Sequence, residues 1–152
     1  MTRLILEFQL EKPEIPLEYD RLMVSFLKAA LEGYSPQMYE KLYDKTKSII
    51  KGFSFALFLP GAKFEGDTIH LQGNRFTMFF SDADMGETIL WFNAFQLMKF
   101  QKYPMNQNSM TLISIRTQSR KEISESEIVV RMQSSLLVRR HNDADNTDRY
   151  FT

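Results

Sequence analysis

The strongest constraint on the fold is a two-residue alternation near the start of the chain. In "LILEFQL", large apolar side chains occupy every second position from Leu4 to Leu10. Successive side chains of a strand point to opposite faces, so this segment predicts a strand with one deeply buried face. Pro13 and Pro16 are expected to end it, because proline has no amide hydrogen for a sheet ladder. Other parts of the chain must therefore cover this face.

Three helical patterns can cover it. The first has apolar side chains three and four residues apart, at Leu22, Met23, Phe26, Leu27 and Ala30. Gly33 can adopt the left-handed conformation that ends such a helix. Ser35-Pro36 is an N-cap and first-turn pair, which predicts a short second helix to Tyr43. A third helix is expected to start with a variant capping box at Ser81 to Asp84 and to run to about Phe100.

Strands are predicted between and after these helices. Phe53 to Leu59 alternates, and residues 68–80 are typical of a hairpin with Gly73-Asn74 in its turn. "TLISIRT", residues 111–117, gives a further strand. The order is then β-α-β-β-α-β, which predicts an α+β protein with a ferredoxin-like domain.

A last hairpin is predicted from "EIVVRMQ" and "SLLVRR", residues 127–133 and 135–140. Residues 1–141 are thus expected to form one ferredoxin-like domain with an appended C-terminal hairpin. Residues 142–152 are expected to be a polar tail or the start of a missing second domain. The third helix agrees with a missing partner, because it is apolar around most of its circumference and so predicts contacts on two sides.

The segment "KGFSFALF", residues 51–58, is close to the signature that RNA-recognition motifs use to stack bases. In those motifs the signature lies on the third strand and has an aromatic partner on the first. Here it lies on the second predicted strand, and the first strand has no aromatic residue at its start. Alternating aromatic residues are also common in half-buried strands. We therefore expect these rings to pack in the core.

Composition is that of a soluble globular domain, with 43% hydrophobic and 25% charged residues. The 19 basic and 19 acidic residues cancel, so attraction to an anionic partner needs local segregation of charge. Two runs without an acidic residue provide it, from Lys99 to Lys121 and from Arg131 to Arg140.

Several classes of function lose support from what the sequence lacks. Without cysteine there is no disulfide, Cys-ligated zinc or thiol catalysis, which agrees with a cytoplasmic location. Phosphate-binding loops, Gly-x-Ser-x-Gly elbows and paired-histidine zinc motifs are absent too. His70 and His141 are far apart in sequence, so no metal and no cofactor are expected. No apolar stretch approaches the ~18 residues of a membrane span.

Four segments resemble a known family in their order and spacing. They are "IPLEYDRLMVSFLKAAL", "LYDKTKSIIKGFSFALFLPGAKFEGDTI", "FTMFFSDADMGETILWFNAF" and "EIVVRMQSSLLVRR". With them, nearly the whole chain resembles the N-terminal half of the CRISPR repeat-processing endoribonucleases of the repeat-associated (RAMP) superfamily, which have two ferredoxin-like domains in tandem. The second domain and the C-terminal Gly-rich loop of that family are missing here, which predicts a fragment of a longer protein. Many members also have a histidine where Tyr43 stands.

The resemblance implies a CRISPR-associated RNA-binding protein. It implies metal-independent cleavage of precursor CRISPR RNA within repeats, leaving 5′-hydroxyl and 2′,3′-cyclic phosphate ends. Because the family histidine is missing, enzyme activity stays open, and a non-catalytic repeat-RNA-binding or complex-assembly module is the alternative. A third alternative is an interaction domain that dimerises through the Trp91 helix. The implied partners are CRISPR repeat RNA, other CRISPR effector-complex subunits and a second copy of the chain, with no membrane.

The resemblance places cleavage in "YDKTKSIIK", where the candidate catalytic residues are Tyr43, Lys47 and Lys51. Cleavage needs a base for the 2′-hydroxyl, and tyrosine with a pKa of about 10 is a poor one unless its surroundings lower that value. The neighbouring lysines Lys41, Lys45, Lys47 and Lys51 could lower it. Alternatively, the tyrosines cover apolar surface and the lysines are solvated.

Candidate RNA-binding residues lie in the two basic runs. They are Arg116, Arg120, Lys121, Arg131, Arg139 and Arg140. Guanidinium groups suit phosphate oxygens, and the resemblance uses the last three positions near RNA. The alternative for those three is a charged strand face that deters edge pairing.

Overall fold

The computed structural model describes residues 2–44, 46, 49–119, 123–129, 138–142 and 147–151. The chain divides into two compact units, Met1–Arg120 and Lys121–Thr152. The described part of the first unit holds three helices and two sheets, and that of the second holds one hairpin. The predicted division into a domain 1–141 and a tail 142–152 stays a prediction.

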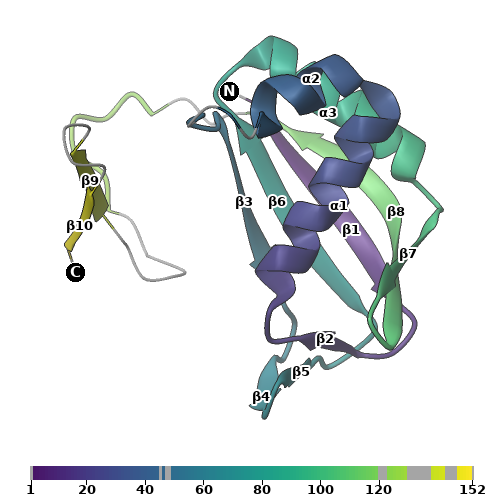
Figure 1. Ribbon diagram of the computed structural model, residues 1–152. Coiled ribbons are helices and arrows are strands. Elements are labelled where there is room, and N and C mark those ends of the chain that lie inside the picture. The colour runs from purple at the N-terminus through teal and green to yellow at the C-terminus, as the bar shows by residue number, and fades with distance from the viewer. Residues whose placement is uncertain are drawn as a thin grey trace. The chain divides into compact units, whose positions relative to one another are not determined.

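An antiparallel sheet of five strands forms the first unit, in the order β3-β6-β1-β8-β7. These strands are β1 Arg3–Leu10, β3 Phe53–Phe58, β6 Arg75–Asp82, β7 Lys102–Met105 and β8 Asn108–Gln118. The helices are α1 Tyr19–Tyr34, α2 Pro36–Tyr43 and α3 Met85–Met98. Without the edge strand β7, the order and the two crossover helices are those of a ferredoxin-like domain, so the predicted α+β fold is confirmed (Figure 1).

The predicted buried face of the first strand is confirmed, and the helices α1 and α3 cover it (Figure 1). The side chains of Leu4, Leu6, Phe8 and Leu10 are at most 2% exposed. From α1, Phe26 meets Phe8 edge to face, with ring centroids 5.2 Å apart. Since β1 lies between β6 and β8, this contact is at the centre of the core.

An aromatic cluster joins α3 to the sheet. Phe80 of β6 lies 4.9 Å from Trp91 and 5.3 Å from Phe95, measured between ring centroids. Phe53 adds a second strand, β3, to the cluster, 5.5 Å from Phe80 and 5.1 Å from Trp91. The first ring of "KGFSFALF" therefore packs in the core, as expected. At the other end of that segment, Phe58 points to the opposite face and is 58% exposed.

The predicted hairpin over residues 68–80 is wrong. Its first arm, β5 Thr68–His70, pairs with β2 Glu14–Pro16 and β4 Lys63–Glu65 in a separate small sheet. Its second arm is β6, which pairs with β3 and β1 of the main sheet. The local hairpin is instead β4 and β5, where Gly66 takes a φ of 61°, which favours glycine.

Helix ends follow the predicted caps in part. The hydroxyl of Ser35 accepts a hydrogen bond from the Met38 amide at 3.4 Å, as predicted for α2. Gly33 does not stop α1, since it lies inside the helix and its φ is not positive. Ser81 lies within β6, and the carboxylate of Asp84 caps α3 by accepting from the Glu87 amide at 2.8 Å.

The described part of the second unit is the hairpin of β9 Val138–Asn142 and β10 Thr147–Phe151. Arg139 and Arg140 thus lie on a strand, but their strand pairs with residues predicted as a polar tail. Residues 130–137, which include most of the predicted last hairpin, lie outside the described residues.

Replacing Phe80 by alanine should destabilise the first unit strongly. The side chain is fully buried and meets Trp91 and Phe95, so truncation should cost about 3–5 kcal/mol of unfolding free energy. Phe58→Ala removes the same side chain from an exposed position and should change stability by less than about 0.5 kcal/mol. Urea unfolding followed by circular dichroism measures both. Equal losses in the two variants would contradict the described orientation of these strands.

Candidate functional site

Two lysines converge on the ring of Tyr43 at the end of α2. The ammonium nitrogen of Lys28, from α1, lies 4.9 Å from the ring centroid. That of Lys51, which directly precedes β3, lies 5.0 Å from it. Tyr39 lies one turn earlier on α2, with its ring centroid 5.4 Å from that of Tyr43. We call Lys28, Tyr39, Tyr43 and Lys51 the lysine–tyrosine cluster.

Cation–π contacts hold each of these two ammonium groups against the Tyr43 ring. Neither lysine has an ion pair with a described acidic residue, and Lys51 is exposed. An anionic group beside the ring would therefore meet positive charge that no described acidic residue compensates. The arrangement suits binding of an anionic group.

The hydroxyl of Tyr43 is buried and has no hydrogen-bond partner among the described residues. Burial raises the pKa of Tyr43 to about 12, and the neighbouring Tyr39 acts in the same direction. The idea that neighbouring lysines lower this pKa is therefore wrong, because desolvation of the phenolate dominates. At neutral pH the phenol stays protonated, which counts against its use as a base.

Lys41 is turned to a different partner. Its ammonium donates to Glu87 at 2.6 Å, and this hydrogen bond raises the pKa of Lys41. The ion pair joins α2 to the first turn of α3. Lys41 therefore does not add a free charge to the lysine–tyrosine cluster.

The buried carboxylate of Asp82 lies next to Gly52, the residue that follows Lys51. Asp82 at the end of β6 is 1% exposed and accepts a hydrogen bond from the Asp84 amide at 2.9 Å. Burial raises the pKa of Asp82, whereas the Asp84 amide and the Trp91 indole favour its ionised form. A Cβ atom at Gly52 would lie only 3.2 Å from Asp82 Oδ1, so glycine allows this close approach. The Gly52 carbonyl also accepts from the Ala83 amide at 3.1 Å, which fixes the backbone beside Lys51.

A second candidate surface is the sheet face that points away from α1 and α3. Arg116 of β8 is opposite Ile5 of β1, and Ile5 is opposite Phe79 of β6, so these side chains share this face. The Arg3 guanidinium lies 5.7 Å from the centroid of the Phe79 ring. We call Arg3, Ile5, Phe58, Phe79 and Arg116 the open sheet face. It combines exposed or half-buried rings with positive charge.

An acidic side chain on this face, Glu7, forms an ion pair with an arginine. Glu7 is the carboxylate of β1 on the same side as Ile5, and Arg75 lies 3.6 Å from it. Arg3 and Arg116 have no such ion pair with a described residue. Two positive charges therefore remain for an anionic ligand.

Several predicted site residues lie outside the described residues. They are Lys45, Lys47, Arg120, Lys121 and Arg131. Arg139 and Arg140 lie on β9 of the second unit, opposite Tyr150 and Arg149. The structure thus brings together Tyr43 and Lys51 and places Arg116 on a different surface.

Sequence reasoning missed Lys28. It lies fifteen positions before Tyr43 on another helix (43 minus 28), and the helical pattern of α1 gives it no special place. Only the packing of α2 against α1 brings it to the ring. Arg3 was missed for the same reason, since its contact with Phe79 depends on the pairing of β1 with β6.

His70 lies between two carboxylates in the small sheet. Its Nδ1 is 3.7 Å from Glu14 and its Nε2 is 3.5 Å from Glu65. Within the described ranges, no three His, Asp or Glu side chains are arranged to hold a metal ion. None of the described helices is long and apolar enough to cross a membrane.

Comparison with known proteins shows similarity in structure only. In sequence, the chain matches no protein-family model and no curated protein. A solved RAMP protein that binds different RNA substrates superposes with a TM-score of 0.73 at 15% identity, covering 99% of this chain and 62% of the other. This chain shares the ferredoxin-like fold of that protein. A Cas6-related protein from Pyrococcus furiosus gives a TM-score of 0.73 at 13% identity, covering 99% and 60%.

A further RAMP-like neighbour is a Cas6 product complex. It is 23% identical, with a TM-score of 0.56 over 75% of this chain and 39% of that one. The resemblance drawn from the sequence is thus confirmed at the level of the fold. This chain spans less than two thirds of the length of these RAMP and Cas6 proteins.

Replacing Tyr43 by phenylalanine should not destabilise the protein at neutral pH. It removes a buried hydroxyl without a described partner and should raise the unfolding free energy by up to about 1 kcal/mol. The folded pKa of about 12 exceeds the unfolded value of about 10, so the unfolded phenol ionises first and the unfolding free energy falls as pH rises from 10 toward 12. Urea midpoints across this range should fall more steeply for the unmodified protein than for Tyr43→Phe. Parallel curves would show that the phenol is solvated.

Proposed function

We propose that this chain is the N-terminal, RNA-binding domain of a CRISPR repeat-processing RAMP protein. The observation that carries the proposal is the two ammonium groups on the Tyr43 ring, neither of which has an ion pair with a described residue. Tyr43 and Lys51 lie in the segment where the sequence resemblance places the reaction, within a fold shared with an RNA-binding RAMP protein. The proposed ligand is CRISPR repeat RNA.

Lys28 and Lys51 would hold one phosphate of the RNA backbone. The Tyr43 ring contacts both ammonium groups, and the Gly52 carbonyl beside Lys51 accepts a hydrogen bond from the Ala83 amide. Because the two charges are placed before the ligand arrives, little side-chain entropy is lost on binding. Phosphate binding of this kind positions the RNA without reading its sequence.

The open sheet face would take unstacked bases and a further part of the backbone. Phe58 and Phe79 offer rings on which bases can stack, and Arg3 and Arg116 offer charge beside them. Stacking of this kind is tolerant of sequence and is typical of single-stranded RNA binding. We therefore propose single-stranded segments of the repeat as the bound form.

Metal-independent cleavage is the second candidate function. The two ammonium groups could stabilise the charge that develops on the phosphate during attack by the 2′-hydroxyl, which would leave a 2′,3′-cyclic phosphate and a 5′-hydroxyl. The described residues of the lysine–tyrosine cluster include no histidine, and the Tyr43 hydroxyl is buried. Binding is therefore better supported than cleavage. A complex-assembly module that binds the same RNA without cleaving it agrees with these observations.

Removing either cluster lysine should weaken RNA binding. For Lys28→Ala and Lys51→Ala we expect about a 3–10-fold loss of affinity for single-stranded repeat RNA, from losing one charge-assisted phosphate contact. The slope of log affinity against log salt concentration should fall by about 0.7 in each variant. Fluorescence anisotropy over a salt series measures both quantities.

Lys63→Ala is the matched control for this experiment. Lys63 is an exposed lysine on β4 of the small sheet, away from the lysine–tyrosine cluster. Its loss changes the net charge by the same amount and should leave the affinity within about twofold. A loss equal to that of Lys28→Ala would mean that only net charge matters, and the proposed phosphate site would be wrong.

Incubation with repeat RNA in EDTA separates the candidate functions. Cleavage of RNA, but not of RNA with a 2′-deoxy substitution at the scissile position, would establish the nuclease. In that case Lys51→Ala should slow cleavage by about 10²-fold through lost charge stabilisation, and Tyr43→Phe should leave the rate within about twofold. Binding of both RNAs without cleavage would support the non-catalytic module. If neither RNA binds, the plain interaction domain is the remaining candidate.

A further inference from the structure

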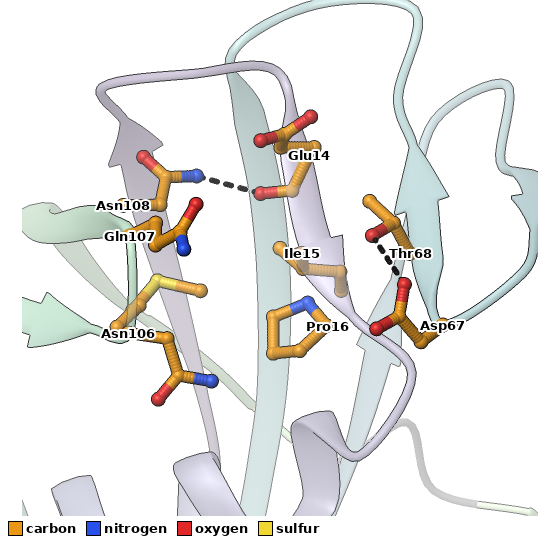
Figure 2. A pocket seen from close by; sticks show the side chains of 9 residues that line it. Glu14, Ile15, Pro16, Asp67, Thr68, Asn106, Gln107 and Asn108 are labelled. Atoms are coloured by element: carbon orange, nitrogen blue, oxygen red, sulfur yellow. Dashed lines mark hydrogen bonds between the residues drawn. The ribbon is translucent and has the colours of Figure 1, made fainter.

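A polar pocket lies between β2 and the turn that joins β7 to β8, at the end of the sheet away from α2 (Figures 1 and 2). Its volume is about 310 Å³, within the range of small-ligand sites. A neighbouring cavity shares Pro16, Asp67 and Asn106 with it. The two cavities therefore form a groove that passes over Pro16.

Hydrogen bonds of Asn108 fix the shape of this pocket. Its side-chain oxygen accepts from the amides of Lys12 at 2.9 Å and Ser109 at 2.8 Å. Its side-chain nitrogen donates to the carbonyls of Lys12 at 3.0 Å and Glu14 at 2.7 Å (Figure 2). Three of these bonds tie Asn108, the first residue of β8, to Lys12 and Glu14, and the fourth joins it to its neighbour Ser109. The pocket is thus formed before a ligand arrives.

Free polar groups and an apolar floor line the pocket. Ile15 and Met105 are each 1% exposed and form the apolar part. The side-chain amides of Asn106 and Gln107 make no hydrogen bond with the described residues, so both can donate and accept. Asp67 adds a carboxylate that the described structure joins only to its neighbour Thr68, at 3.3 Å.

The charge of the lining disfavours phosphate. Glu14 and Asp67 are both acidic, and none of the residues that line the pocket is a lysine or arginine. A ligand must therefore present hydrogen-bond donors to carboxylate oxygens and flat apolar surface to the floor. Nucleobases have both features, and their phosphates can stay outside the pocket.

We propose that this pocket binds one unstacked guanine base of the RNA. Guanine has two adjacent donor groups, N1–H and N2–H₂, which match the two oxygens of a carboxylate such as Asp67. Adenine and uracil lack this pair, and cytosine has only the exocyclic amine. The amides of Asn106 and Gln107 would meet the remaining acceptors of the base. The inference rests on the proposed RNA binding and adds a base preference to it.

Guanosine without phosphate is the probe that tests this site. It is titrated into the ¹⁵N-labelled full chain, alongside adenosine, cytidine and uridine, and amide shifts are followed by NMR. Guanosine should move the side-chain signals of Asn106 and Gln107 and bind at least about fivefold tighter than the other three nucleosides. Asp67→Asn should weaken guanosine binding by about tenfold, because a charge-assisted pair of hydrogen bonds is lost.

Glu32→Gln is the matched control, since Glu32 is an exposed acid on α1 that does not line the pocket. It should leave guanosine binding unchanged. Guanosine 5′-monophosphate should bind no tighter than guanosine, because the lining is acidic. The guanine site would be overturned if all four nucleosides bound equally or if none bound saturably. It would also be overturned if N-acetyl-arginine amide bound more tightly than guanosine.

Failure of this proposal is distinct from failure of the proposed function. Lys28→Ala should leave guanosine binding unchanged while it weakens RNA binding. Loss of the guanine site with intact repeat-RNA binding would overturn only the base preference. A guanosine effect that disappears in Lys28→Ala would place the nucleoside at the lysine–tyrosine cluster and so overturn the pocket.

Discussion

The packing of Trp91 and Phe95 on Phe80 is the contact on which the rest of the first unit depends. It fixes α3 on β6, and β6 lies between β3 and β1 in the sheet. The same contact sets the start of α3, where Asp84 caps the helix and donates its amide to Asp82. The amide of Ala83, directly after β6, in turn donates to the Gly52 carbonyl. The aromatic core thus determines where Lys51 lies.

Much of the fold could be predicted from local patterns, because strand alternation and helix capping act over few residues. The buried face of β1 and the start of α2 are examples. The small sheet could not be predicted in this way, because β2 and β5, which pair in it, lie far apart in the sequence. Gly73-Asn74 has the sequence of a hairpin turn, but β5 pairs with the distant strand β2 and does not form a hairpin with β6. Gly33 is likewise of the residue type that often ends a helix, but it does not adopt the positive φ of such an end.

Only the part of the candidate site that lies in one short sequence segment could be predicted. Tyr43 and Lys51 lie eight positions apart (51 minus 43) in one stretch, and the structure brings both to one place. Lys28 belongs to another helix and has no local signal. The protonation of Tyr43 depends on how deeply its hydroxyl is buried, which no sequence pattern gives. Of the predicted basic residues, Arg116 lies on the open sheet face, whereas Arg3 on the same face has no signal in the sequence pattern.

The central place of β1 has a consequence for biosynthesis. This strand leaves the ribosome before its two neighbours, β6 and β8, which are made much later. The apolar face from Leu4 to Leu10 therefore has no sheet partner on its second side until residues 108–118 have emerged. Pairings of such high sequence separation form slowly, and the nascent chain exposes an aggregation-prone strand during this interval. Protection of that strand by a chaperone would matter more here than in a protein built from local hairpins.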